Sequence, residues 1–179
     1  MRNWNVVAII REGGFNEALR VLGEFGYVWR SRFYNVFLMK VANTRELLES
    51  MRRRLAENPG SLAFLSRLLP VEMTFEFSTR EEFEEKAKES VLAFVAELGG
   101  KSFHVRIHRR GSKGMFQSPG EERLLDRLLL GELEKAGSPG SIGYEDPDAI
   151  VAIETMENRA GVSLWRREDF TLYPFVRVE

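Results

Sequence analysis

Hydrophobic positions in the first third of the chain follow strand and helix periods in turn. Residues 4–10 form an apolar, partly β-branched run that predicts a buried strand. Apolar side chains at helical spacing follow over residues 15–25, and Gly26 marks the end of this helix. Residues 27–41 are too many for one ordinary strand. We therefore expect a hairpin there, with its turn near residues 30–35.

A second helix and a further strand complete this region. Asn43 and Glu46 have the spacing of a capping box, and an apolar stripe continues to residue 55. Residues 61–69 predict a short third helix, which ends at Pro70. Residues 71–77 alternate apolar with polar side chains, as a strand with one buried face does. The resulting order, βαββαβ, is that of the ferredoxin-like arrangement.

The second half of the chain also mixes helices with strands. The patterns predict helices over residues 79–98 and 118–133, strands over 101–108, 149–153 and 162–165, and an edge strand or arm over 170–178. Strand side chains alternate between two faces. Phe103, Val105 and Ile107 should therefore face one side, and His104, Arg106 and His108 the other. The sequence thus predicts an α/β (α+β) protein with a polar, partly basic sheet face.

Composition excludes several kinds of chemistry. The chain has no cysteine and two histidines, so disulfides, thiolate metal sites and cysteine nucleophiles are absent. The two histidines lie four residues apart on a predicted strand, about 13 Å at roughly 3.3 Å per residue, which is too far to share one metal. We predict no cofactor and no metal. No apolar run approaches the length of about 20 residues that spans a bilayer, and no signal peptide is evident. We therefore expect no membrane association and a cytoplasmic location.

The net charge of −1 conceals separate basic and acidic regions. Residues 101–120 hold five Lys or Arg and no acid, and residues 1–70 hold eleven against six. Residues 71–100 hold three against eight, and residues 121–179 seven against thirteen. A local excess of this kind can attract phosphate where the net charge predicts nothing.

Few residues suit catalysis, and more suit the binding of phosphate. Nucleophile elbows, Walker loops and dinucleotide fingerprints are absent. Glu154, at the end of a predicted buried strand, favours a structural ion pair with an arginine over a catalytic role. The glycine-punctuated stretch 109–114 would let arginine side chains and backbone amides approach a phosphate. The candidate nucleic-acid-binding residues in and around this stretch are Lys101, Arg106, His108, Arg109, Arg110 and Lys113.

A second candidate binding segment is formed by Trp165, Arg166 and Arg167. An exposed indole and two guanidinium groups could stack on bases. The alternative is that Trp165 covers the core and both arginines are solvated.

Several blocks of the second half resemble a THUMP domain, a domain of thiouridine synthases, RNA methylases and pseudouridine synthases. The blocks are residues 103–111, 118–130, 145–150, 153–154 and 160–164. The chain is most similar to the stand-alone THUMP proteins that assist tRNA cytidine acetylation. The resemblance implies an N-terminal ferredoxin-like domain over residues 1–77, followed by a THUMP domain over residues 78–179. It also implies that both domains together bind the acceptor end of tRNA.

No methylase, thiouridylase or pseudouridine synthase module follows in the sequence. We therefore expect a non-catalytic adaptor that binds tRNA or another structured RNA and presents it to a modifying enzyme in trans. Two alternatives remain open. One is a protein–protein scaffold without an RNA role, and the other is a small RNA-processing enzyme that uses His108 and a carboxylate.

Overall fold

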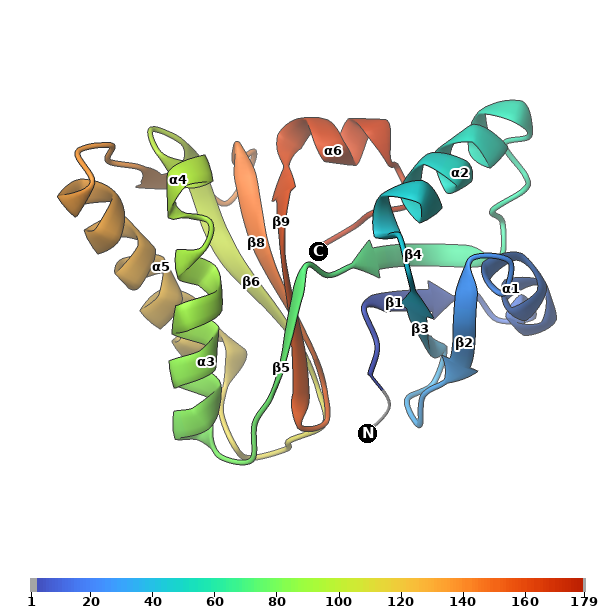
Figure 1. Cartoon of the computed structure of the whole chain (residues 1–179), viewed down its shortest axis with the longest axis horizontal. Helices are drawn as coiled ribbons and strands as arrows, with labels where there is room; N and C mark the ends of the chain where they lie inside the picture. The colour runs from blue at the N-terminus through green and yellow to red at the C-terminus, as the bar shows by residue number, and fades with distance from the viewer. Residues whose placement is uncertain (1–2, 179) are drawn as a thin grey trace. The chain divides into compact units, whose positions relative to one another are not determined.

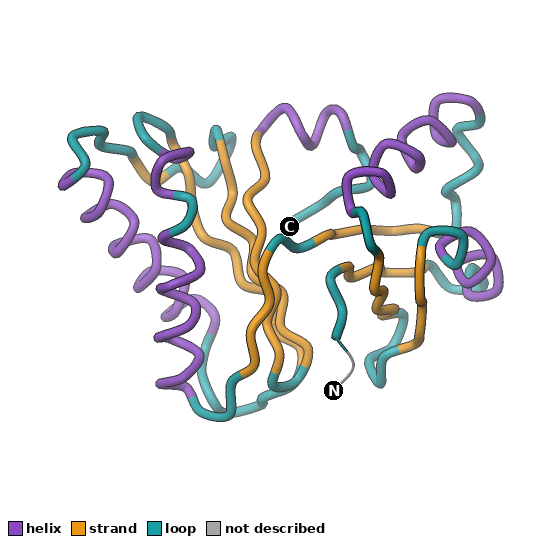
Figure 2. Tube along the Cα trace, in the orientation of Figure 1, coloured by secondary structure: helices purple, strands orange, loops and turns teal. Residues whose placement is uncertain are grey.

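Two β-sheets organise the chain, and each forms the centre of its own compact unit. The computed structural model describes residues 3–178. Within this range, the residues up to Val71 form the first unit together with Asp169–Arg177, and Glu72–Glu168 form the second together with Val178. Figure 1 shows the mixed α/β architecture, and Figure 2 marks its helices and strands. The fold class predicted from the sequence is thereby confirmed.

The first unit has the strand and helix order of the ferredoxin-like arrangement. Its antiparallel sheet has the strand order β2-β3-β1-β4. Helices α1 and α2 bury their apolar stripes, and Asn43 Oδ1 accepts a 3.0 Å hydrogen bond from the Glu46 amide as the predicted cap. The elements are β1 (Val6–Ile10), α1 (Phe15–Leu22), β2 (Gly26–Arg30), β3 (Val36–Val41), α2 (Thr44–Glu57) and β4 (Leu65–Pro70).

The strand that closes this sheet differs from the prediction. Residues 61–69 were expected to form a helix, but β4 occupies Leu65–Pro70 and pairs with β1. A short apolar run is compatible with a buried strand and with a buried helix. The spacing of its apolar residues therefore does not distinguish the two. Pro70 lies at the end of an edge strand, where its missing N–H breaks no sheet ladder.

The second unit is a five-stranded mixed sheet with helices on one face (Figure 1). Its strand order is β5-β9-β8-β6-β7; β6 runs parallel to β7 and β8, and the remaining pairs are antiparallel. All eight residues of the central strand β8 are buried, as its continuous apolar run predicts. The elements are β5 (Met73–Glu76), α3 (Arg80–Leu92), α4 (Val95–Leu98), β6 (Ser102–Arg110), α5 (Ser118–Lys135), β7 (Ser141–Ile142), β8 (Ala149–Met156) and β9 (Arg159–Arg166).

Strand β5 belongs to the second sheet, although the sequence pattern assigned it to the first. It pairs with β9 from Met73 to Glu76. Alternation predicts that a strand has one buried face, but it does not say which sheet the strand joins. The domain limits 1–77 and 78–179 stay a prediction, and residues 1, 2 and 179 of those ranges lie outside the described part.

Carboxylates of helix α5 cover the exposed edge of strand β6. The Val105 amide donates to Asp126 Oδ1 at 2.8 Å, and the Ile107 amide donates to Glu122 Oε1 at 2.8 Å. Glu122 and Asp126 are four residues apart, so both lie on the same face of the helix. Because β7 pairs with only the first two residues of β6, these carboxylates satisfy strand amides that have no neighbouring strand.

The segment after β9 forms helix α6 (Arg167–Leu172) and an irregular stretch, instead of the predicted edge strand or arm. Its later residues pack in the first unit. The Leu68 amide donates to the Phe175 carbonyl at 2.9 Å, and the Tyr173 hydroxyl donates to Glu49 Oε1 at 2.5 Å. That hydrogen bond lowers the pKa of the Glu49 carboxyl. No helix within residues 3–178 combines the length and apolar character needed to cross a membrane.

Candidate nucleic-acid interface

The glycine-punctuated loop after β6 is held in place at both ends. Gly111, Ser112 and Gly114 all have positive φ, at 85°, 47° and 84°. A Cβ atom at Gly111 would lie 2.8 Å from Glu157 Cα, so only glycine fits there. At the other end Phe116 is buried, with its ring stacked 4.3 Å from the ring of Phe83. The loop is therefore a fixed part of the second unit.

This loop borders a recess of about 470 Å³ beside the first turn of α5. The α5 N-cap residue, Gln117, makes no side-chain capping hydrogen bond. The N-terminal end of an 18-residue helix carries partial positive charge and amide donors, which favour anions. We call this space the loop recess; its lining residues are Arg80, Arg109, Gly114, Met115, Phe116, Gln117 and Gly120.

Arg80 reaches the loop recess from the start of α3. Its guanidinium lies 2.9 Å from the carboxylates of both Glu121 and Glu84. Glu121 is buried, and burial raises the pKa of its carboxyl although Arg80 opposes the shift. The Glu121 charge in turn raises the pKa of Arg80. Part of the positive charge of Arg80 is thus balanced by acids of the same unit.

The positive charges of Arg109 and Lys113 are less neutralised by nearby carboxylates than the charge of Arg80. Arg109 Nη1 donates to the Gly111 carbonyl at 2.7 Å, and within residues 3–178 no carboxylate forms an ion pair with it. Lys113 is exposed beside Gly114, likewise without a carboxylate partner in that range. Arg109 lines the loop recess and Lys113 lies next to its lining residue Gly114, so both can attract an anion to the start of α5.

Arg110, the neighbour of Arg109, is engaged in the interior of the unit. Its Nη1 lies 2.6 Å from Glu154 Oε2, and the Glu154 side chain has no solvent exposure. Successive strand residues point to opposite faces, so Arg109 and Arg110 cannot both face the recess. The arginine partner expected for Glu154 is therefore Arg110, which has a structural contact besides its predicted role in binding.

Three predicted residues lie at the far end of the second sheet. Lys101 precedes β6, eight residues before Arg109, or about 26 Å at roughly 3.3 Å per residue. Arg166 pairs with Ala149 at the same end of the sheet, and its guanidinium binds Glu97. Arg167 contacts Asp146 at 2.9 Å and Asp148 at 3.1 Å. The structure does not bring these residues together with the loop recess.

Arg106 and His108 lie between these two ends on β6. Arg106 is exposed, with its Nη1 at 3.9 Å from Glu122. His108 Nε2 forms a hydrogen bond with the Val178 carbonyl. The two side chains share one face of the strand, and Phe103, Val105 and Ile107 occupy the buried opposite face as predicted.

Trp165 is buried and only 6% exposed, and its Nε1 donates to Ser163 Oγ at 2.8 Å. The ring covers the core, which is the alternative left open by the sequence. An exposed indole that stacks on bases is not present in this structure, because β9 presents this position to the interior.

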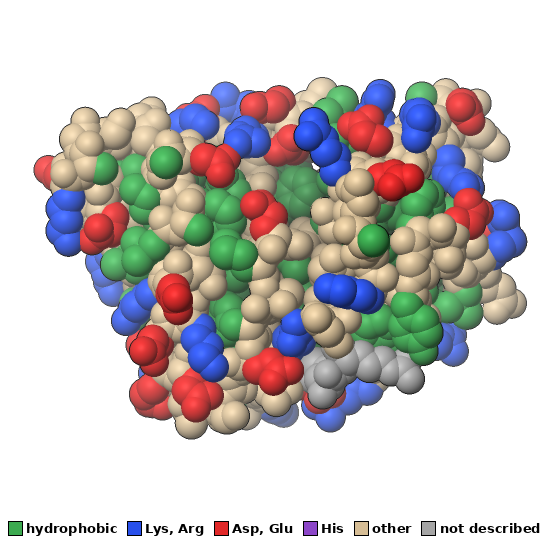
Figure 3. Space-filling view, in the orientation of Figure 1, with side chains coloured by type: hydrophobic (Ala, Val, Ile, Leu, Met, Phe, Trp, Pro, Cys, Tyr) green, Lys and Arg blue, Asp and Glu red, His purple; other side chains and the backbone are tan. Residues whose placement is uncertain are grey.

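Arg80 and the uncapped start of α5 were not predicted as site residues. Arg80 is 29 positions from Arg109 in sequence, and only tertiary packing brings the two to one recess. Basic and acidic side chains are mixed over the visible face of α3 (Figure 3), so the net charge of this segment gave no indication that Arg80 belongs to a binding site. No group of three His, Asp or Glu within residues 3–178 is arranged to hold a metal ion.

The chain matches several solved structures. No family model matches it, and no curated protein sequence matches it. TrmN from Thermus thermophilus matches with a TM-score of 0.62 and 18% identity, over 90% of this chain and 45% of that one. A 4-thiouridine synthetase in complex with RNA and ATP matches at 0.59 and 16%, over 92% and 42%. SMU.472, a putative methyltransferase complexed with SAH, matches at 0.51 and 18%, over 92% and 42%.

These likenesses show a THUMP-like fold. The chain spans about half the length, or less, of the solved chains that it matches.

The comparison also corrects the expected function. The sequence predicted a non-catalytic adaptor and no enzyme, whereas the structures that share this fold include a 4-thiouridine synthetase and a putative methyltransferase. Catalytic proteins thus carry this fold, and the prediction of a non-catalytic adaptor is wrong. The absence of a catalytic module from the sequence was the reason for that prediction, and such an absence does not show that the protein has no part in catalysis.

Proposed function

We propose that this chain is the RNA-binding part of a catalytic RNA-modifying enzyme, and that it binds structured RNA, with tRNA as the first candidate. The proposal includes a cytoplasmic location. It assigns contact with the RNA backbone to the loop recess, with Arg109 and Lys113 as the principal cations. Arg106 and His108 point to the other face of β6, so the proposal gives them no contact in the loop recess.

The observation that carries the proposal is the combination of Arg109 with the start of α5. A phosphate in the loop recess would meet a guanidinium, backbone amides and the positive end of a helix at once. The 4-thiouridine synthetase of like fold was solved in complex with RNA, which supports RNA as the ligand class.

A salt-titrated binding assay tests RNA recognition directly. Purified protein would be titrated with tRNA and with duplex DNA of similar size at several salt concentrations. Phosphate contacts release counterions, so the affinity for tRNA should fall steeply as salt rises. Preference for tRNA over DNA supports the proposal, and absence of tRNA binding at low salt overturns it.

Arg109→Ala tests the assigned site, with Lys135→Ala as the matched control. Both substitutions remove one positive charge, but Lys135 lies at the opposite end of α5 from Ser118, about 26 Å along the helix at roughly 1.5 Å per residue. Arg109→Ala should weaken tRNA binding several-fold and reduce the salt dependence by about one phosphate contact. Lys135→Ala should change neither. Equal effects of the two variants would show that the site lies elsewhere.

The catalytic part of the proposal is tested in cells. Deletion of the gene should remove one modified nucleoside from total tRNA, as measured by mass spectrometry of digested RNA. Wild-type protein and Lys135→Ala should restore that nucleoside, and Arg109→Ala should restore it poorly. An unchanged nucleoside profile after deletion would contradict a role in RNA modification.

A further inference from the structure

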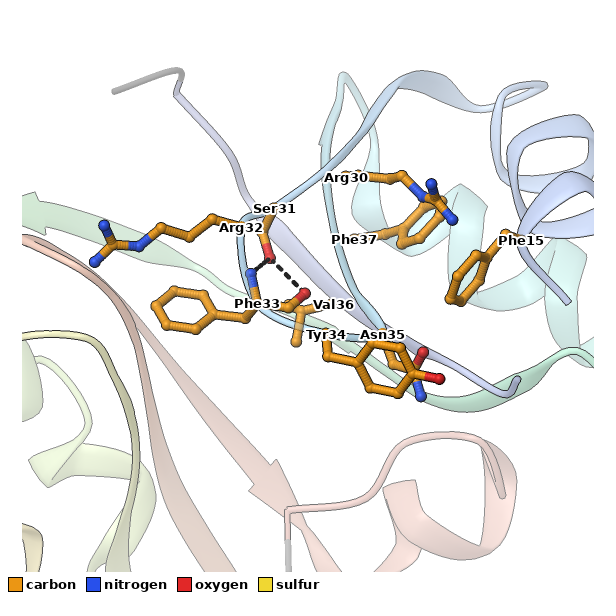
Figure 4. A pocket seen from close by; sticks show the side chains of 9 residues that line it. All are labelled: Phe15, Arg30, Ser31, Arg32, Phe33, Tyr34, Asn35, Val36 and Phe37. Carbon is orange, nitrogen blue, oxygen red and sulfur yellow. Dashed lines mark hydrogen bonds between the residues drawn. The ribbon is translucent and has the colours of Figure 1, made fainter. Parts of the chain in front are cut away.

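A second candidate site lies in the first unit, at the hairpin between β2 and β3. It is a pocket of about 370 Å³, within the range of about 300–1,000 Å³ of small-molecule sites. We call it the hairpin pocket. Figure 4 shows its lining, which consists of aromatic rings, two arginines and small polar groups: Phe15, Arg30, Ser31, Arg32, Phe33, Tyr34, Asn35, Val36 and Phe37.

The backbone of the hairpin turn is already ordered by local hydrogen bonds. Ser31 Oγ accepts a 3.0 Å bond from the Phe33 amide, and the Ser31 amide donates to the Val36 carbonyl at 2.9 Å. Asn35 has a φ of 60°, and its carbonyl accepts a 2.8 Å bond from the Ile10 amide of β1. A ligand would therefore bind without the entropic cost of ordering this loop.

Aromatic rings and guanidinium groups lie close together in the pocket. The Arg30 guanidinium lies 4.2 Å from the ring centroid of Phe15 and 5.7 Å from that of Phe37 (Figure 4). On the other side of the turn, the Arg32 guanidinium lies 5.3 Å from the ring of Phe33. Flat rings and guanidinium planes are the surfaces on which unpaired bases stack.

Tyr34 is the most exposed large hydrophobic side chain in the described part of the molecule, at 72%. Exposure of a large aromatic ring at a loop tip adds nothing to folding, and such a ring is a candidate for contact with a ligand. Tyr27 on β2, at 57%, is also exposed, but its ring packs 5.4 Å from the ring of Trp29 and does not line the pocket.

The segment that contains β2, β3 and their turn carries charge of one sign. Between Glu24 and Glu46 the sequence contains four basic residues and no acid. Arg30 forms no ion pair with any carboxylate within residues 3–178. A ligand that combines a flat ring with a negative charge satisfies both properties of the pocket, and a nucleotide has this chemistry.

The geometry points to the hairpin pocket as a site for an unpaired nucleotide of the bound RNA, with its base stacked on Tyr34 and its phosphate held by Arg30. This inference rests on the proposed RNA-binding function and adds a site that is separate from the loop recess. Recognition of a base by stacking tolerates all four bases, so the site selects single-stranded character instead of sequence.

Three RNAs separate base stacking from phosphate binding. The first is a blunt hairpin, the second carries a five-nucleotide single-stranded extension, and the third carries the same extension with abasic sugars. Affinities would be measured by fluorescence anisotropy. Wild-type protein should bind the second RNA about fivefold or more tightly than the third, as expected for loss of a stacked base.

Substitutions at Tyr34 assign that preference to the hairpin pocket. Tyr34→Ala should abolish the preference, Tyr34→Phe should keep it because the ring remains, and Tyr27→Ala should keep it because that ring is outside the pocket. Arg109→Ala should weaken binding of all three RNAs equally.

Equal affinity of wild-type protein for the second and third RNAs, or an unchanged preference in Tyr34→Ala, would overturn the inference. Retained binding of the blunt hairpin in such a case would leave the proposed function intact. Failure to bind any of the three RNAs would overturn both.

Discussion

Arg110 Nη1 lies 2.6 Å from Glu154 Oε2, and this pair joins the end of β6 to the interior of β8. A buried carboxylate is costly unless it is paired, so the ion pair with Arg110 offsets part of the cost of burying Glu154. The two adjacent arginines of the basic stretch therefore differ in what they stabilise: Arg110 has a structural role, and Arg109 faces the loop recess.

Arg110→Ala should destabilise the fold by about 3–5 kcal/mol, because it removes the guanidinium that pairs with a carboxylate of zero solvent exposure. Urea denaturation measures this loss. The double variant Arg110→Met with Glu154→Leu should recover most of the stability, since apolar side chains replace both charges. Equal stability of Arg110→Ala and wild-type protein would show that the pair contributes nothing.

Asp126 should make the stability of the second unit depend on pH. Burial raises the pKa of this carboxyl from 3.8 to about 6, while the Val105 amide and His104 oppose the shift. Between these values the folded protein holds a proton that the unfolded chain has released. The contribution is therefore complete below about pH 4 and is lost as the pH rises to about 6.

Asp126→Asn removes this titration and keeps an oxygen that can accept from the Val105 amide. The free energy of unfolding of wild-type protein minus that of the variant should fall by on the order of 2–3 kcal/mol between pH 4 and pH 7. The difference isolates Asp126 from other acids, such as Glu49, whose pKa is lowered. A difference that is flat across this range would contradict the assignment.

Gly111 and Gly114 provide a matched test of the loop. Both have positive φ, but a Cβ at Gly111 would lie 2.8 Å from Glu157 Cα, whereas a Cβ at Gly114 meets nothing within 4 Å. Gly114→Ala should cost about 1–2 kcal/mol from the left-handed conformation alone. Gly111→Ala should cost more, because backbone atoms must also move. Gly111→Ala should therefore have the lower melting temperature of the two variants, and the opposite order would contradict this explanation.

Trp165→Ala should act on stability and not selectively on RNA. Truncation of a buried tryptophan leaves a cavity and costs about 3–5 kcal/mol. Trp165→Phe should fold and bind tRNA with wild-type affinity at a temperature where both proteins are folded. A loss of affinity in folded Trp165→Phe would restore the base-stacking role that the sequence suggested.

Local patterns predicted the elements well where caps and periods agreed. Asn43 caps α2 and Thr79 caps α3, and β6 has the expected buried and polar faces. The exceptions are α6, where an edge strand or arm was expected, and β4, where the apolar residues of a short run fit either period. The period of the apolar residues shows that one face of a segment is buried. It does not show which other helix or strand that face packs against.

The candidate sites were less predictable for the same reason. Arg109 and Lys113 belong to a basic stretch that the sequence displays, and their role in RNA binding stays a prediction. Arg80 lies in an acidic stretch and reaches the loop recess only through the packing of α3 and α5. The sequence predicted only a turn near residues 30–35. It did not show that the rings and guanidinium groups of this turn would line a pocket together with Phe15.

The segment Asp169–Arg177 completes the first unit, although every strand of the second unit precedes it in sequence. During translation, β5 to β9 have all been synthesised before Tyr173 and Phe175 reach their contacts with Glu49 and Leu68. The first unit therefore gains its last segment only after every strand of both sheets has been synthesised. A nascent chain that stops before this segment would contain every strand of both sheets, but its first unit would lack the contacts of Tyr173 and Phe175.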